Sequence, residues 1–233
     1  MWLLNSSIGK KLIMSISGLF LILFLVFHLC MNIAAVFSGE AYNVICGLLG
    51  SNWYALLGTL VLAAGVVVHF VYAIILTLQN RKARGNDRYA INARPKGVEW
   101  ASQNMLVLGL IVIVGLGLHL VNFWAKMQLP ELMHNMGMQT DAATLAYAAN
   151  GVHHIENTFG NPVYVVLYLI WLGALWFHLT HGFWSSMQSL GWNNKVWINR
   201  WKCISNIYST IVVVCFALVV VVFFAKSLCG GAC

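Results

Sequence analysis

The stretch LIMSISGLFLILFLVFHLCMNIAAVF, residues Leu12–Phe37, decides the fold class. It contains no Asp, Glu, Lys or Arg, and it exceeds the roughly 20 apolar residues that a helix needs to cross a hydrocarbon core of about 30 Å. We therefore expect a membrane-spanning helix here. Four further stretches of the same kind follow, at about Tyr54–Leu78, Gln103–Ala125, Val163–Met187 and Ile204–Ala225.

The composition agrees with a chain that is solvated by lipid. Hydrophobic residues make up 61% and charged residues only 8%, whereas a soluble domain is roughly 45–50% apolar. Within lipid only helices and closed barrels satisfy every backbone group, and these runs lack the alternation of a barrel strand. The first run is also too long for the apolar region of a signal peptide, so it is expected to be retained. The sequence thus predicts an all-α, polytopic bundle of five spans, forming a single domain over residues 1–233 with no soluble domain.

The basic residues predict the orientation of this bundle. Eleven of the thirteen Lys and Arg residues fall before the first span, between the second and third, or between the fourth and fifth. Because cytoplasmic loops are enriched in Lys and Arg, the N-terminus is expected in the cytoplasm and the C-terminus outside. The net charge of +7 then reflects membrane topology, and nucleic acid is not an expected partner. The eleven residues are Lys10, Lys11, Arg81, Lys82, Arg84, Arg88, Arg94, Lys96, Lys195, Arg200 and Lys202.

Two outer segments carry further expectations. The segment from Lys126 to Pro162 is long and rich in glycine, and we expect it to form a short interfacial helix or a cap. Cys229 and Cys233 close the chain in Cys-Gly-Gly-Ala-Cys, where either a disulfide or two free thiols is compatible with the sequence. No Cys-x-x-Cys-His occurs, so covalent haem attachment is not indicated.

Histidines within the spans point to a cofactor, because ionisable residues inside a membrane are costly. His28 lies 17 residues after Lys11 and His119 lies 16 after Gln103, whereas His69 lies 12 before Arg81 and His178 lies 11 before Ser189. At a rise of about 1.5 Å per residue, the first two lie about 24–26 Å from the cytoplasmic end and the last two about 16–18 Å. The histidines therefore form an outer and an inner level, each supplied by two helices.

Two imidazoles that face each other from separate helices can hold the iron of a haem from both sides, and a bundle interior is a usual place for such a cofactor. Two levels therefore predict two b-type haems, with His28, His69, His119 and His178 as axial ligands of iron. His181, three residues after His178, is an alternative ligand on the fourth span.

These residues resemble the five-helix, dihaem cytochrome b subunit of bacterial succinate:quinone oxidoreductases, which comprise succinate dehydrogenases and quinol:fumarate reductases. The resemblance covers nearly the whole chain. It rests on Ser-x-x-Gly-Lys-Lys at Ser6–Lys11 leading to His28, on one histidine in each of the next three spans, and on Phe177-His178-Leu179-Thr180-His181-Gly182-Phe183-Trp184. A comparable His-x-x-x-Gly setting in the family favours His178 as the ligand.

The resemblance implies a proximal haem on His69 and His178 and a distal haem on His28 and His119. It implies a membrane anchor of the bacterial inner membrane that passes electrons between an iron–sulfur subunit and menaquinone or menaquinol. FAD, the iron–sulfur clusters and the dicarboxylate chemistry would reside on a flavoprotein and an iron–sulfur partner subunit docked on the basic cytoplasmic face. The physiological direction of electron flow stays open.

Several finer expectations follow from the same resemblance. Ser15, Ser17 and Trp100 are candidates for contacts to the propionates of the proximal haem. A quinone site near the distal haem is plausible, with Glu40 as a candidate proton group. Some family members carry a glutamate two residues before the fourth-span ligand, where this chain has Trp176.

Two alternatives remain at this point. One is the haem b anchor of another respiratory complex, of the formate dehydrogenase or nitrate reductase type. The other is a membrane protein without redox function, although the spans lack the intramembrane carboxylates and broken helices that are usual in transporters.

Overall fold

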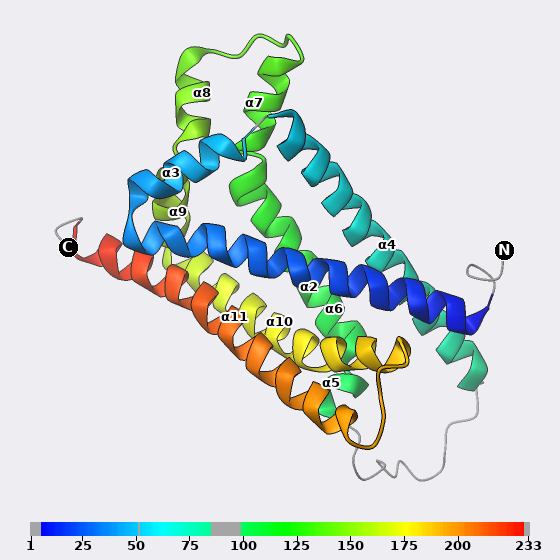
Figure 1. The fold of residues 1–233 in the computed structure, drawn as a ribbon. Helices are drawn as coiled ribbons and strands as arrows, with labels where there is room; N and C mark the ends of the chain where they lie inside the picture. Colours follow the sequence, from blue (N-terminus) through cyan, green and yellow to red (C-terminus); the bar gives the residue numbers. More distant parts are fainter. Residues whose placement is uncertain (1–5, 51, 85–98, 231–233) are drawn as a thin grey trace.

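The computed structural model describes residues 6–50, 52–84 and 99–230. Within them the chain is helical, with no strand, and five helices are long and apolar enough to cross a membrane (Figure 1). This confirms the expected all-α, five-span architecture. The five helices are α2 (Ser7–Phe37), α4 (Trp53–Arg84), α6 (Met105–His119, continued by a π-helical turn at Leu120–Trp124), α10 (Pro162–Ser189) and α11 (Trp197–Leu228).

The helix ends follow local capping chemistry. Ser6 caps α2 by accepting a hydrogen bond from the Gly9 backbone N–H at 3.0 Å. Ser38 ends α2 and caps the short helix α3 (Gly39–Leu48), accepting from the Ala41 N–H at 3.2 Å. Pro162 occupies the first turn of α10, where its missing N–H has no cost. Gly191 adopts a φ of 82° directly after α10, which turns the chain toward α11.

The third span begins later than the sequence indicated. Residues Trp100–Gln103 form a separate short helix, α5, and the chain bends at Asn104 before α6 begins at Met105. The Asn104 side chain donates to the Trp100 carbonyl at 2.8 Å, which closes α5 and lets α6 start in a new direction.

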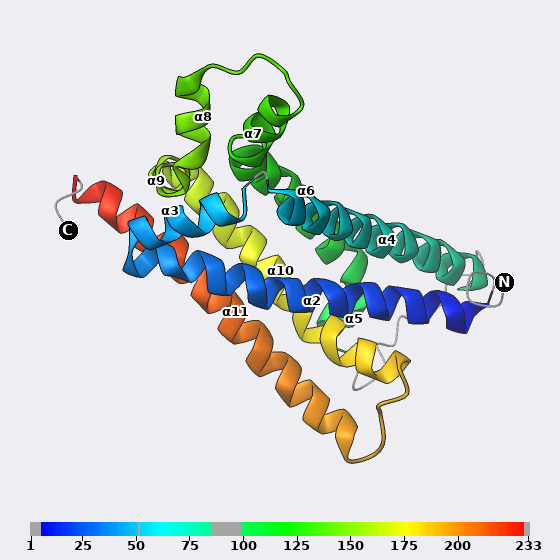
Figure 2. The ribbon, with the colours of Figure 1, turned by 45° about the horizontal axis from the view of Figure 1, so that its top comes forward.

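The expected outer cap consists of three short helices, α7 (Gln128–Asn135), α8 (Ala142–Ala149) and α9 (Gly151–Phe159). Together with α3 they gather at the end of the bundle where α11 ends, while the start of α2 and the α10–α11 turn lie toward the other end (Figures 1 and 2). The two described chain ends thus lie at opposite ends of the bundle, as five spans require. Three of the basic residues that predicted the orientation, Arg88, Arg94 and Lys96, and also Cys233, lie outside the described residues.

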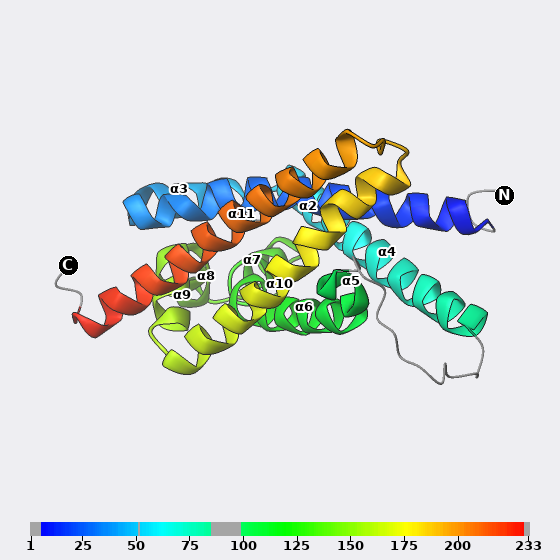
Figure 3. The same ribbon diagram turned by 90° about the horizontal axis from the view of Figure 1, so that it is seen from below.

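Helix α10 is the centre of the packing. It contacts α2, α6 and α11, and α11 also lies against α2, whereas α4 packs closely on α2 (Figure 3). Ser205 and Ser209 of α11 are fully buried, and the Ser205 hydroxyl donates to the carbonyls of Leu179 and Thr180 at 3.1 and 2.7 Å. Small residues four apart allow such close approach of helices in lipid. Leu23 of α2, Leu60 of α4 and Val114 of α6 are instead about 70% exposed, as expected of lipid-facing positions.

Candidate functional site

The four histidines of the first four spans meet in two pairs inside the bundle. His28 of α2 faces His119 of α6 with 5.7 Å between ring centroids, and His69 of α4 faces His178 of α10 with 6.3 Å. These are the two pairs that depth along the helices indicates. No hydrogen bond joins the two rings of either pair among the described residues.

Both separations suit one metal ion between two imidazoles. A bond from a first-row metal to an imidazole nitrogen is about 2.0–2.1 Å, and the ring centroid lies about 1.1 Å behind that nitrogen, so two ligands in line place their centroids about 6.3 Å apart. The His69–His178 pair has this spacing, and the His28–His119 pair is about half an ångström shorter. The planes of the two rings make an angle of 77° in the His69–His178 pair and of 88° in the His28–His119 pair.

The helices that carry each pair stand apart. Across the described residues, α2 does not pack closely on α6, and α4 does not pack closely on α10, although α2 packs on α4 and α10 packs on α6. Each imidazole pair therefore reaches across a separation that the helix backbones do not close. Flat cofactors occupy such positions between facing helices of bundles.

At the outer pair, the polar neighbour of His28 is Asn32, one turn further along α2. The Asn32 amide donates to the His28 carbonyl at 2.8 Å and lies 3.4 Å from each of the two ring nitrogens of His28. The Tyr42 hydroxyl of α3 donates to the Asn32 side-chain oxygen at 3.2 Å. The ring of His28 is further enclosed by Phe24 and Phe216.

His119 lies at the junction where α6 changes into a π-helical turn. The Ala125 N–H bonds to the Leu120 carbonyl at 2.8 Å, which is the i to i+5 pattern. Such turns are frequent at functional sites, because they reorient side chains within a helix. The turn buries Asn122, whose amide donates to the Tyr168 hydroxyl at 3.3 Å.

Aromatic side chains hold the ring of His119. The rings of Phe123, Tyr168 and Trp171 lie 5.0, 6.3 and 5.7 Å from it, centroid to centroid. Trp171 is itself fixed by a hydrogen bond of 3.0 Å from its indole nitrogen to the Val112 carbonyl. Gly115 makes room for this indole, because a Cβ there would overlap the ring.

At the inner pair, a relay of hydrogen bonds orients His69. The Ser17 hydroxyl donates to the Met14 carbonyl at 3.1 Å and lies 3.3 Å from Nδ1 of His69. The His69 ring also makes a hydrogen bond with the Met14 carbonyl, which can only accept, so the ring nitrogen on this side carries the proton and Nε2 is left with a free lone pair. Gly18 allows the approach, as a Cβ there would meet Cε1 of His69 at 3.1 Å.

His178 and His181 have different surroundings. Nδ1 of His178 is buried without a hydrogen-bond partner among the described residues, which is costly for a neutral ring unless a ligand compensates. Nδ1 of His181 lies 3.2 Å from a carboxylate oxygen of Glu99. The ring that faces His69 is that of His178.

Glu99 gathers a polar cluster that the sequence did not reveal. Besides His181, its carboxylate binds the Lys202 ammonium at 2.9 Å and accepts from the indole nitrogen of Trp184 at 3.2 Å. Burial alone would raise the pKa of Glu99, but the bonds from Lys202 and His181 outweigh it and hold the pKa below its usual value. The sequence feature that could have drawn attention to Glu99 is the scarcity of acidic residues, because Glu99 is one of only six in the chain.

The remaining predicted residues lie at varied places. Ser15 is buried in α2, and Ser17 is engaged with His69. Trp100 is 55% exposed at the start of α5, with its ring 5.0 Å from that of Phe177. Glu40 is exposed in the first turn of α3.

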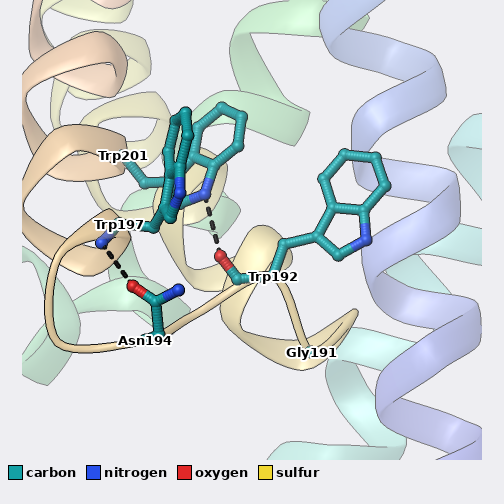
Figure 4. A pocket seen from close by; sticks show the side chains of 5 residues that line it. All are labelled: Gly191, Trp192, Asn194, Trp197 and Trp201. Atoms are coloured by element: carbon teal, nitrogen blue, oxygen red, sulfur yellow. Dashed lines mark hydrogen bonds between the residues drawn. The ribbon is translucent and has the colours of Figure 1, made fainter.

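The turn between α10 and α11 carries an indole-rich pocket of about 280 Å³ (Figure 4). Asn194 caps α11 by accepting from the Trp197 N–H at 2.8 Å, and the Trp201 indole donates to the Trp192 carbonyl at 2.9 Å. Exposed tryptophans at a helix end are typical of the membrane–water interface.

Each pair brings together two imidazoles, a donor set that can serve as the two axial ligands of a haem. In the described part of the chain, no three His, Cys, Asp or Glu side chains come together as a metal site. Each pair thus offers two nitrogens, and a porphyrin would supply the other four. No protein-family model, no curated protein and no solved structure matches this sequence.

Proposed function

We propose that this chain is the membrane-anchor cytochrome b subunit of a succinate:quinone oxidoreductase. It relays electrons through two b haems between an iron–sulfur subunit and membrane quinone. The observation that carries the proposal is the meeting of two imidazole pairs, at metal-bridging separations, from helices that do not pack closely on each other. The sequence resemblance supplies the class of complex.

In this proposal, His69 and His178 hold the inner haem and His28 and His119 the outer one. A haem bound at each pair supplies one-electron redox chemistry. The residues of the chain position it: Ser17 keeps Nε2 of His69 free for iron, and Phe123, Tyr168 and Trp171 fix the plane of His119. The lipid-facing helix surfaces keep water away from the centres.

The decisive experiment measures haem content and visible spectra of the purified protein after reduction by dithionite. We expect two haems b per chain. His69→Ala and His119→Ala should each lower the content to one, and each should remove a different spectral component. His134→Ala, in the exposed outer segment, is the matched control and should keep both. A preparation without haem in wild-type protein would reject the proposal.

The class of complex is tested separately. We expect a flavoprotein with covalently bound FAD and an iron–sulfur protein to purify with this chain from native membranes. Recovery of a molybdenum-containing partner instead would favour the formate dehydrogenase or nitrate reductase type.

A further inference from the structure

The loop that joins α7 to α8 exposes three methionines. Met133, Met136 and Met138 are 37%, 58% and 49% exposed. In the outer segment from Lys126 to Pro162, all of which the structure describes, the one other exposed large hydrophobic side chain is Tyr147. The loop projects away from the spanning helices (Figures 1 and 2). The methionines are therefore presented at the tip of the outer cap.

The leucines of the same segment lie differently. Leu129, Leu132 and Leu145 are half-buried. A surface that served only to contact lipid or another protein would expose leucine as readily as methionine, because the two side chains are similar in volume and both are apolar. The exposure is thus specific to the apolar residue that carries sulfur.

The end of α7 brings the three methionines to one side. The Met138 N–H donates to the Met133 carbonyl at 3.0 Å. The Gly137 N–H donates to the His134 carbonyl at 2.9 Å, and Gly137 has a φ of 81°. Together these bonds form a Schellman motif, which folds Met138 back beside Met133. Met136 is three residues after Met133, which places their Cβ atoms about 5–6 Å apart.

Three neutral thioether sulfurs are a ligand set for a soft cation. Thioethers favour Cu(I), whereas Mg²⁺ and Ca²⁺ take oxygen ligands. With metal–sulfur bonds of about 2.3 Å, three sulfurs around one ion in a plane lie about 4 Å apart. Methionine has three rotatable bonds, so its sulfur can close that span from Cβ atoms about 5–6 Å apart.

The position of the loop favours methionine as the sulfur ligand. The basic residues indicate that this end of the bundle lies outside the cytoplasm, where thiols form disulfides. A thioether cannot form a disulfide, so its sulfur stays available to a metal. His134 lies on another side of α7, because one residue along a helix is a rotation of about 100° from Met133 and two residues about 200° from Met136.

We propose that Met133, Met136 and Met138 bind one Cu(I) ion through their three sulfur atoms. The site is separate from the two histidine pairs and does not depend on the proposed electron relay. Binding involves no change in the oxidation state of copper.

Copper binding is measured on the purified full-length protein by equilibrium dialysis. Cu(I) is kept reduced by ascorbate and buffered by bathocuproine disulfonate, and accessible thiols are first blocked with N-ethylmaleimide, because cysteine also binds Cu(I). Copper is counted by mass spectrometry, so haem absorbance does not interfere. We expect one Cu(I) per chain, with X-ray absorption showing sulfur neighbours at about 2.3 Å. A wild-type protein without copper, or copper held by nitrogen or oxygen alone, would overturn the inference.

Leucine substitutions test the sulfur atoms directly. The triple variant Met133→Leu/Met136→Leu/Met138→Leu should lose this copper, because leucine keeps the volume and removes the sulfur. Each single variant should bind Cu(I) at least about tenfold more weakly, which corresponds to about 1.4 kcal/mol. All should elute as wild type in size-exclusion chromatography, which shows that they fold.

Two controls should keep the copper. One replaces three methionines outside the loop by leucine, namely Met105, Met127 and Met187. The other is His134→Ala. Copper retained by the loop triple variant, or lost equally from the control triple variant, would show that the ion lies elsewhere and would overturn the site.

Discussion

Replacing Gly115 by alanine tests whether the surroundings of His119 are as closely fitted as the structure shows. The added Cβ would overlap the Trp171 indole, which is half-buried and bonded to the Val112 carbonyl. Forcing one methyl group into a filled site costs about 1–3 kcal/mol. If the indole turns away, its hydrogen bond is lost as well, at about 0.5–1.5 kcal/mol. The total loss in free energy of unfolding is therefore about 1.5–4.5 kcal/mol.

The assay is reversible unfolding in mixed micelles by titration with dodecyl sulfate, monitored by tryptophan fluorescence. Gly117→Ala is the matched control on the same helix, because a Cβ there meets no atom within 4 Å. That control should be neutral or up to about 1 kcal/mol more stable, since alanine favours helix over glycine. Displacement of Trp171 also moves the ring of His119, so Gly115→Ala should lose the outer haem before the inner one. Equal stability and equal haem content in the two variants would refute the reasoning.

Three further changes probe other contacts. Ser17→Ala removes one of the two groups, the Ser17 hydroxyl and the Met14 carbonyl, that orient the ring of His69. A redox titration should show a shifted potential for one haem only, and two unchanged potentials would contradict this role of Ser17. Ser205→Val adds bulk at a fully buried position of α11 that touches the α10 backbone and should lower the free energy of unfolding by about 1–3 kcal/mol, whereas the exposed Ser227→Val should not. Burial lowers the pKa of His154 in α9, against the opposing hydrogen bond with the Tyr147 carbonyl. The folded state then binds fewer protons than the unfolded state, so stability is full above about pH 6.5 and falls as the pH drops below it; His154→Gln should flatten that decline, and an unchanged pH profile would exclude His154 as its source.

The five spans could be predicted because their signal is strong and local. Twenty or more apolar residues without charge permit little besides a helix in lipid, whatever surrounds them. The pairing of histidines could be predicted for a similar reason, since an α-helix converts residue number into depth at a fixed rise. To sort the four histidines into two depths, only the direction of each span has to be known. The basic residues indicate that direction.

The side-chain surroundings of the pairs could not be predicted in this way. Ser17 could be assigned to a propionate or to a histidine with equal ease from the sequence, because the choice depends on how far α2 is rotated about its axis against α4. Glu99 stands beside a segment without hydrophobic periodicity, and its partners His181 and Lys202 come from two other helices. The π-helical turn after His119 has no sequence signature, and in the structure it contains Asn122, which is buried and bonded to Tyr168.

The arrangement of helices links stability to cofactor binding in the proposed function. In the described structure, α4 packs closely only on α2, and no residue in its most apolar window is buried, whereas a third of the corresponding window of α10 is. One side of His69 is anchored by Ser17, and its other side points toward His178 across a separation that protein contacts do not close. Helices in lipid gain little from hydrophobic attraction to each other, so an imidazole–iron–imidazole link would be a large share of what ties α4 to α10. The separation that admits a haem is therefore also what makes α4 depend on it, and a tighter bundle would be more stable alone and unable to carry electrons.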